Sequence, residues 1–153
     1  MTSRYENREG GPAIRPYIPS DYAELGRLCA ALWPGHAQAD LDAWLARGEA
    51  AAVFVAEWAP GCLCGFAEVG EREYADCCDT SPVAYLEGWY VDADARGRSV
   101  GRELIRAVEE WARSRGYREL ASDTHLENTG SQRAHTRLGF EETERLVLFR
   151  KAL

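Results

Sequence analysis

A single glutamate interrupts the most hydrophobic run of the chain, and a basic turn follows that run. The run spans Val83–Val91 and contains Glu87, and the turn spans Arg96–Gly101 and opens an amphipathic helix. Free backbone N–H groups and the positive end of the helix dipole converge at such a turn, which suits a phosphate group. A desolvated carboxylate is suited to accept a proton. The sequence therefore predicts binding of a phosphorylated cofactor and proton-transfer chemistry at Glu87.

Size and charge limit the classes of function. The chain has 153 residues, of which 46% are hydrophobic, and a formal net charge of −7. That length predicts one domain, residues 12–153, after a flexible N-terminus, residues 1–11. The negative charge argues against a general nucleic-acid or anionic-membrane binder and favours a cationic small molecule.

Cysteine number and spacing argue against a metal site or a disulfide framework. The five cysteines are odd in number and lack finger-like spacing with histidines, so we expect reduced thiols and no metal. The N-terminus has no apolar stretch like a signal peptide, and no later run approaches the length of a membrane span. We expect a soluble, cytoplasmic protein.

Hydrophobic periodicity and turn residues predict the order of the secondary-structure elements. The order is one strand, two helices, three strands, a helix, a strand, a helix, and one or two closing strands. The predicted strands are 13–18, 52–57, 62–69, 83–91, 117–122 and 140–150, and the predicted helices are one ending before Pro34, then 39–47, 100–115 and 128–138. This order predicts a mixed α/β fold with a mainly antiparallel sheet and some parallel pairing near the later helices.

Several blocks in the same order resemble the GCN5-related N-acetyltransferase (GNAT) superfamily, in its aminoglycoside 6′-N-acetyltransferase branch. The blocks are Leu32–His36, Cys78–Val83, Leu86–Gly88, Ala121–Thr124, Glu127–Asn128 and Leu138–Arg145. The resemblance implies a GNAT fold of the α/β (α+β) class, in which strands four and five splay apart. It also implies acetyl-CoA as cosubstrate, direct transfer to the 6′-amine in a ternary complex, aminoglycoside resistance, and a homodimer whose C-terminal strands lie near the partner.

The resemblance also implies a cofactor site. The turn from Gly97 would cradle the pyrophosphate, and the end of strand four would offer backbone groups to the pantetheine. The implied cofactor residues are Trp89, Tyr90, Val91, Arg96, Gly97, Arg98, Ser99, Val100, Gly101, Arg102, Asn128 and His135. Ser99 stands where the family has its central glycine, and a positive φ there would cost about 1 kcal/mol.

For a polycationic acceptor, the resemblance implies a pocket of aromatic and acidic side chains. These residues are Trp33, His36, Tyr74, Glu87, Asp123 and Glu144, with Asp76 and Asp79 as a wider negative rim. Aromatic faces attract ammonium groups, and carboxylates pair with amines. Glu87 is the first candidate for the catalytic base, and Asp123 is the second, as a base or as a ligand for the ammonium.

Each assignment has a structural alternative. Glu87 could form an ion pair with an arginine, Asp123 could be a turn residue, and Asn128 could be a helix N-cap. His135 occupies the position where many superfamily members have a tyrosine that protonates the departing thiolate. It could equally be a buried histidine whose hydrogen bonds are satisfied. Trp33 and Tyr74 could belong to the core.

Three alternatives concern the reaction itself. Transfer could pass through Cys77 or Cys78, although no histidine is nearby in sequence to form a thiolate. The acceptor could instead be a polyamine, a peptide or a metabolite. Finally, the chain could be a non-catalytic module that binds acetyl-CoA.

Overall fold

The computed structural model describes residue 5, residues 10–35 and residues 38–153. The chain divides into two compact units, residues 1–122 and 123–153. The first unit contains a five-stranded sheet in the order β1-β2-β3-β4-β5. Its strands are β1 (Ala13–Pro16), β2 (Ala51–Ala59), β3 (Cys62–Arg72), β4 (Val83–Val91) and β5 (Leu120–Ser122).

The sheet is a meander of four antiparallel strands, to which β5 adds in parallel beside β4. This arrangement confirms the predicted mixed and mainly antiparallel sheet. The predicted bounds of β4 are also correct. β5 is shorter than predicted because the N–H groups of Gly116 and Tyr117 still bond to carbonyls of the preceding helix, so the strand begins at Leu120.

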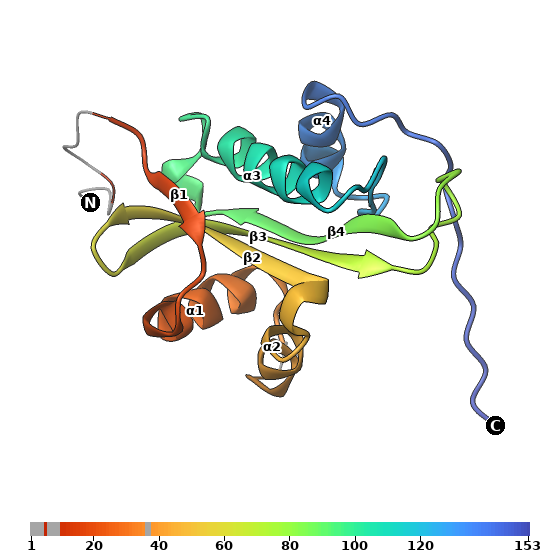
Figure 1. Ribbon diagram of the computed structural model, residues 1–153, viewed down its shortest axis with the longest axis horizontal. Coiled ribbons are helices and arrows are strands. Elements are labelled where there is room, and N and C mark those ends of the chain that lie inside the picture. Colours follow the sequence, from red (N-terminus) through yellow and green to blue (C-terminus); the bar gives the residue numbers. More distant parts are fainter. Residues whose placement is uncertain (1–4, 6–9, 36–37) are drawn as a thin grey trace. The chain divides into compact units, whose positions relative to one another are not determined.

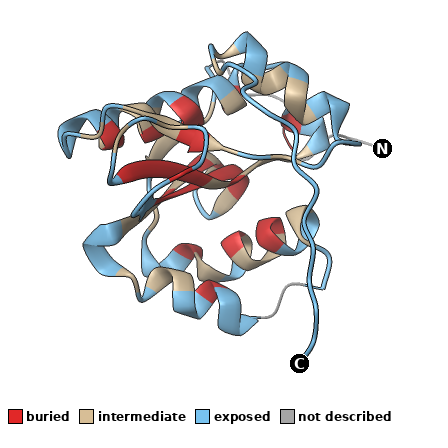
Figure 2. Cartoon of the chain, turned by 90° about the vertical axis from the view of Figure 1, so that its right-hand side faces the viewer, coloured by how far each residue is buried: buried red, intermediate tan, exposed pale blue. Residues whose placement is uncertain are grey.

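Helices cover both faces of the sheet in the first unit. Helices α1 (Tyr22–Leu32) and α2 (Gln38–Leu45) lie on one face, and α3 (Val100–Ser114) lies on the other (Figure 1). Three short 3₁₀ turns, Pro19–Asp21, Gly48–Ala50 and Ala93–Ala95, connect these elements. Buried residues gather in the strands and on the helix sides that face them (Figure 2). The core on the α1 side contains Leu25, Leu28, Cys29, Leu41, Val53, Val55, Leu63 and Phe66.

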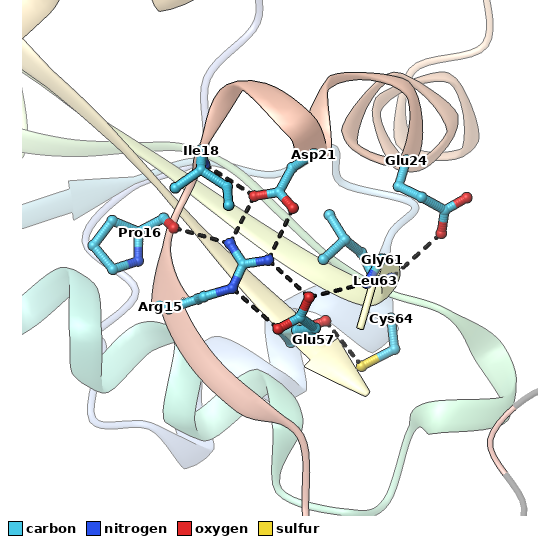
Figure 3. Close-up of polar contacts among 10 residues, drawn as sticks. Arg15, Pro16, Ile18, Asp21, Glu24, Glu57, Gly61, Leu63 and Cys64 are labelled. Carbon is cyan, nitrogen blue, oxygen red and sulfur yellow. Dashed lines mark hydrogen bonds and ion pairs between the residues drawn. The ribbon is translucent and has the colours of Figure 1, made fainter. Parts of the chain in front are cut away.

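A cluster of ion pairs fixes the start of α1 to the sheet. The Arg15 guanidinium on β1 donates to both carboxylate oxygens of Asp21, at 2.7 and 2.9 Å, and to those of Glu57 on β2, at 2.9 and 3.2 Å (Figure 3). Asp21 also accepts the Ile18 N–H at 2.9 Å. The hydrogen bonds from Arg15 hold the pKa of Asp21 below its ordinary value. The cluster thereby positions α1 at its N-terminal end.

A β-bulge lies where β3 meets the middle of β4. Glu68 pairs with Gly88, but the next residue, Val69, pairs with Leu86, so Glu87 is the extra residue. In such a bulge two residues of one strand oppose a single residue of the other, and the strand twists more sharply. Glu87 and Gly88 therefore both lie opposite Glu68.

Pairing between β4 and β5 ends at Leu86 and Ser122, where β5 also ends. Residues 87–91 of β4 continue without a β5 partner, as the implied splay requires. Within the described residues, none of the helices has the length and apolar character needed to span a bilayer.

The second unit contains helix α4 (Thr129–Arg137). The Asn128 side chain accepts the Ser131 N–H at 3.0 Å, and Gly139 ends the helix region with φ of +90°. The predicted closing strands are wrong, because residues 140–153 have no strand in the structure. Apolar side chains there are 56–93% exposed from Leu146 to Phe149, and strand propensity alone does not form a strand without a pairing edge.

Candidate active site

The turn before α3 has the geometry of an anion site. Gly97 has φ of +76°, and Ser99, the N-cap residue of α3, has φ of +62° and ψ of +5°. The Ser99 side chain makes no capping hydrogen bond. Its carbonyl accepts the N–H of Glu103, so the helix dipole begins at this residue. The first-turn backbone donors of α3 point away from its own hydrogen-bond ladder and suit a phosphate group.

Two arginines of this turn shape it. Arg96 Nε donates to the Val91 carbonyl at 2.9 Å, and Arg98 lies with its guanidinium carbon 5.2 Å from the Trp58 ring centroid. Arg102 is exposed on the first turn of α3. The Arg96 contact ties the turn to the end of β4, and the Arg98 contact ties it to β2. The three arginines place cationic side chains around the helix N-terminus, which favours an anionic ligand.

The end of β4 and the start of α3 are packed together. A Cβ at Gly101 would lie 2.9 Å from Trp89 Cζ2, so the indole occupies the space that a side chain at position 101 would need. On its other edge β4 pairs with β3, through Trp89↔Ala67, Tyr90↔Phe66 and Val91↔Gly65. The structure thus brings together, within the first unit, the predicted cofactor residues of β4 and of the turn.

Glu87 lies on β4 in an ion pair with Arg72 of β3. Arg72 donates through Nε at 2.8 Å and through Nη2 at 2.6 Å to the two carboxylate oxygens of Glu87. The Arg72 guanidinium carbon also lies 3.4 Å from the Tyr85 ring centroid. Only 20% of the Glu87 side chain is exposed, against 43% for Arg72. Glu87 therefore forms the arginine ion pair that was its structural alternative, and this ion pair holds the carboxylate in a fixed orientation.

Trp33, at the C-terminal end of α1, lies over the bulge. A Cβ at Gly88 would be 2.4 Å from Trp33 Cη2, so the indole occupies the place of a side chain at position 88. The Trp33 ring also meets Phe66 edge-on, at 6.1 Å between centroids. The structure thus brings Trp33 beside the residue that follows Glu87.

We expect Gly88→Ala to impair use of the acceptor while preserving cofactor binding. The added methyl would displace the Trp33 indole and cost about 1–3 kcal/mol of stability through overpacking. The expected kinetic result is a rise of about tenfold in the acceptor KM, with the CoA dissociation constant changed by less than about twofold. Steady-state kinetics and calorimetric titration of CoA measure the two effects.

Gly26→Ala is the matched control for Gly88→Ala. Gly26 lies in α1, and a Cβ there meets nothing closer than Gln38 Nε2 at 3.9 Å. Because alanine has a higher helix propensity than glycine, we expect Gly26→Ala to raise the free energy of unfolding by about 0.5–1 kcal/mol. An unchanged acceptor KM in Gly88→Ala would contradict a role of the Trp33 position in acceptor binding.

The other predicted acceptor residues of the first unit lie on the loop between β3 and β4. Tyr74 is 68% exposed, which excludes the core alternative for it, and Asp76 and Asp79 are exposed too. The Asp79 N–H donates to Glu119 at 3.0 Å, which fixes the loop beside the start of β5. The prediction for His36 lies outside the described residues.

The predicted residues of the second unit have local partners. Asn128 is the N-cap of α4, as its structural alternative states. His135 Nδ1 donates to the Ser131 carbonyl at 2.8 Å, and its ring meets Phe140 at 5.0 Å. Asp123 directly follows Ser122, and Glu144 is exposed beyond α4.

Two further observations bear on the chemistry. Within the described residues no group of histidine, cysteine and carboxylate side chains could hold a metal ion. Burial, followed by the neighbouring Cys77, raises the pKa of Cys78 to about 12. Cys78 is therefore a poor thiolate nucleophile at neutral pH.

Comparison with known proteins identifies the fold and its relatives. The model of the acetyltransferase (GNAT) family matches residues 18–140. The aminoglycoside N(6′)-acetyltransferase type 1 of Stenotrophomonas maltophilia is 46% identical over 145 residues, which cover 93% of this chain and 94% of that protein. The enzyme of the same name from Salmonella typhimurium is 48% identical, over 78% of this chain and 85% of that protein. This chain belongs to the GNAT acetyltransferases, in their aminoglycoside 6′-N-acetyltransferase branch.

Solved structures of GNAT acetyltransferases agree. AAC(6′)-Iy in complex with the bisubstrate analogue CoA-S-monomethyl-acetylneamine has a TM-score of 0.86 and 41% identity, covering 94% of this chain and all of that chain. AAC(6′)-Iy in complex with CoA has a TM-score of 0.87 and 41% identity, over 95% of this chain and 98% of that chain.

In this GNAT chain the positive φ of Ser99 predicts how a substitution there changes the free energy of unfolding. Serine in the left-handed region is strained, whereas glycine is not. We expect Ser99→Gly to raise the free energy of unfolding by about 1 kcal/mol and to bind CoA at least as tightly. Ser114→Gly, inside the last turn of α3, is the matched control and should instead lose about 0.5–1 kcal/mol. A loss of stability in Ser99→Gly, measured by urea unfolding, would contradict the strain.

Sequence reasoning missed one buried carboxylate, which lies at the β4 bulge beside Glu87. Glu68 on β3 is 5% exposed, and the Cys29 thiol lies 3.8 Å from its Oε1. The signal was present, since Glu68 interrupts the apolar run Cys62–Gly70 just as Glu87 interrupts β4. The register of β3 against β4, which places the two glutamates at one bulge, was not visible in the sequence.

Proposed function

We propose that this chain transfers the acetyl group of acetyl-CoA to the 6′-amine of aminoglycosides, by direct attack in a ternary complex. The observation that carries the proposal is the full-length similarity to AAC(6′)-Iy, which was solved with an analogue that joins CoA to acetylneamine. In this proposal, the turn before α3 would bind the cofactor and the carboxylate at the β4 bulge would accept the proton, which are two parts that such a reaction needs. Acetylation removes a positive charge from the drug, which supports a role in aminoglycoside resistance.

The cofactor would be held by backbone groups of the first unit. The N-terminus of α3, from Gly97 to Arg102, would bind the pyrophosphate, and residues 89–91 of β4 would bond the pantetheine amides. The end of β4–β5 pairing at Leu86 and Ser122 supports this assignment, because residues 89–91 of β4 lie beyond the last pair. The cofactor supplies an activated acetyl thioester. Asn128 and His135 remain proposed contacts of the cofactor.

The acceptor amine must lose a proton before it attacks, because an alkyl ammonium has a pKa well above neutral. Glu87 is the proposed proton acceptor, directly or through a water molecule. Its ion pair with Arg72 fixes the carboxylate, and its low exposure reduces competition from water. Asp123 is the second candidate, as a base or as a ligand for the ammonium.

The departing thiolate needs no enzymic acid in this proposal, because the pKa of an alkyl thiol is about 8.5. His135 is bonded to a helix carbonyl at Nδ1, which fits the role of a satisfied histidine. The raised pKa of Cys78 argues against an acetyl-cysteine intermediate there. Direct attack is therefore the simpler route.

Thiol release from acetyl-CoA tests the function. The acceptor panel is kanamycin, tobramycin, gentamicin forms with and without a free 6′-amine, spermidine and a lysine-containing peptide. We expect turnover of the compounds that have a free 6′-amine. Turnover of spermidine or the peptide alone would show that the acceptor is not an aminoglycoside. Binding of acetyl-CoA without any turnover would favour the non-catalytic module.

We also propose that the two units form one acetyltransferase domain, residues 12–153, since the family model spans residues 18–140 and crosses their boundary. A homodimer is proposed as well. Four consecutive apolar residues, Leu146–Phe149, are 56–93% exposed, and a strand-forming run without an edge favours pairing with a second copy.

We expect a dimer mass in light scattering for the full chain. Replacement of Leu148 by lysine should shift that mass toward the monomer, because a charge in an apolar strand interface is costly. A matched change at Lys151, to glutamine, should leave the mass unchanged. A monomeric full chain would contradict the proposal.

A further inference from the structure

Two carboxylates that interact electrostatically, Glu68 of β3 and Glu87 of β4, lie at the β4 bulge, but their surroundings differ. Glu87 has a bidentate ion pair with Arg72. Glu68 is 5% exposed, and among the described residues no cation lies within ion-pair distance of it. Its polar neighbour is the Cys29 thiol of α1, at 3.8 Å. The bulge thus sets an unneutralised carboxyl opposite a neutralised one.

Among the residues that the structure describes, the titratable groups around Glu68 come from two elements packed against β3. Cys29 faces it from α1, and Glu87 faces it from β4, while Arg72 acts through Glu87. On the β2 side, Glu68 pairs with the apolar Val53. Burial raises the pKa of Glu68 to about 7, the hydrogen bond from Cys29 opposes that rise, and the charge of Glu87 adds a smaller increase. Burial and the Glu68 carboxyl raise the pKa of Cys29 to about 12, so this thiol stays protonated.

Glu68 adds a second carboxylate at the bulge when it is ionised, and Arg72 places a positive charge there through its ion pair with Glu87. The charge of Glu68 changes near neutral pH, because burial raises its pKa to about 7. A substrate ammonium near the bulge is attracted more strongly when Glu68 carries its negative charge.

We propose that Glu68 is a positioning residue of the acetyl transfer, whose buried carboxylate, set opposite Glu87 and Gly88 by the bulge, attracts the substrate ammonium toward Glu87. This inference rests on the proposed function, since it assumes that an ammonium is deprotonated at Glu87. No bond is made or broken at Glu68. Its charge acts on the ammonium that approaches Glu87, and a polycationic acceptor is the substrate class that gains most from a second carboxylate beside the first.

Glu68→Gln tests the proposal through the pH profile. The amide copies the protonated carboxyl in size but cannot ionise. With neamine as acceptor, we expect kcat/KM of Glu68→Gln to match the wild type near about pH 6 and to be about tenfold lower near about pH 8.5. Loss of a structural contact alone would lower kcat/KM by the same factor across the range, and that result would overturn the proposal.

Two variants separate the charge of Glu68 from its packing. Glu68→Asp keeps an ionisable carboxyl and should restore the rise of kcat/KM with pH, even if its absolute activity is lower. Glu73→Gln removes an exposed carboxylate just beyond β3 and should leave the pH profile unchanged. A Glu73→Gln profile that changes as much as that of Glu68→Gln would also overturn the proposal, since overall charge would then suffice.

A second measurement does not depend on activity. Carbon-13 NMR of the glutamate carboxyls, assigned by Glu68→Gln, follows the titration of Glu68 directly. We expect a midpoint near pH 7 in the wild type, moved lower in Glu87→Gln because the facing charge is gone. A midpoint that does not move would overturn the coupling. Absence of turnover with every amine would refute the proposed function. The titration would then still decide whether Glu68 and Glu87 are electrostatically coupled.

Discussion

Glu87→Gln is expected to lower kcat for aminoglycosides by a factor on the order of 10²–10⁴, the usual contribution of a general base. The amide keeps the size of the side chain and can still contact Arg72, but it cannot accept a proton. The proposed cofactor turn lies at the N-terminus of α3 and is not part of this ion pair, so the CoA dissociation constant should change by less than about twofold. Thiol-release kinetics and calorimetry measure both quantities.

Arg72→Gln separates catalysis by Glu87 from its structural role. If Glu87 serves only the ion pair, removal of either partner should have the same effect on stability and on kcat. If Glu87 is the base, Arg72→Gln should retain most of kcat while Glu87→Gln loses it. Glu110→Gln, an exposed carboxylate on α3, controls for the change in charge. Unchanged turnover in Glu87→Gln would remove Glu87 as the base and leave Asp123 as the candidate.

Arg15→Ala is expected to cost about 3–5 kcal/mol of unfolding free energy. Asp21 is 3% exposed at its side chain, and loss of the guanidinium would leave its charge buried without the partner that compensates it. Glu57 would lose the same partner. Urea unfolding near neutral pH measures the difference. Arg113→Ala, which removes an exposed pair with Glu109 on α3, should cost far less, about 0.3–0.5 kcal/mol.

The same ion pair predicts a pH dependence. Arg15 holds the pKa of Asp21 below its ordinary value, so the folded protein binds fewer protons than the unfolded chain as the pH falls toward the unfolded pKa. The stabilisation by this pair is therefore complete above the unfolded pKa and is lost as the pH decreases through the folded pKa. The acid loss of stability should be shallower in Arg15→Ala. An identical slope in both proteins would contradict the assignment.

Regular elements and the position of the turn before α3 followed from sequence because local rules determine them. Val83–Val91 is a continuous apolar run between turn residues, and α3 has an apolar stripe at helical spacing followed by Gly116, so both were predicted nearly residue for residue. For Ser99 the sequence supported a conditional prediction, namely strain if its φ were positive, because a glycine is expected at that place in the turn. The observed φ is positive.

Features that depend on register or on a partner did not follow. The bulge that sets Glu68 opposite Glu87 arises from the alignment of two strands, and no local pattern reveals which glutamate of an apolar strand meets which. Leu146–Phe149 has the composition of a strand, but a strand exists only with an edge to pair with. Both failures concern long-range pairing rather than local conformation.

The position of the acetyl group on the product tests the central claim most directly. After incubation of the full chain with acetyl-CoA and neamine, two-dimensional NMR of the purified product identifies the acetylated nitrogen. Acetylation of the 6′-amine alone is the predicted result. Acetylation of another ring amine would contradict the claim. Neamine that stays unmodified, under conditions in which the enzyme fully acetylates a different amine, would also contradict it.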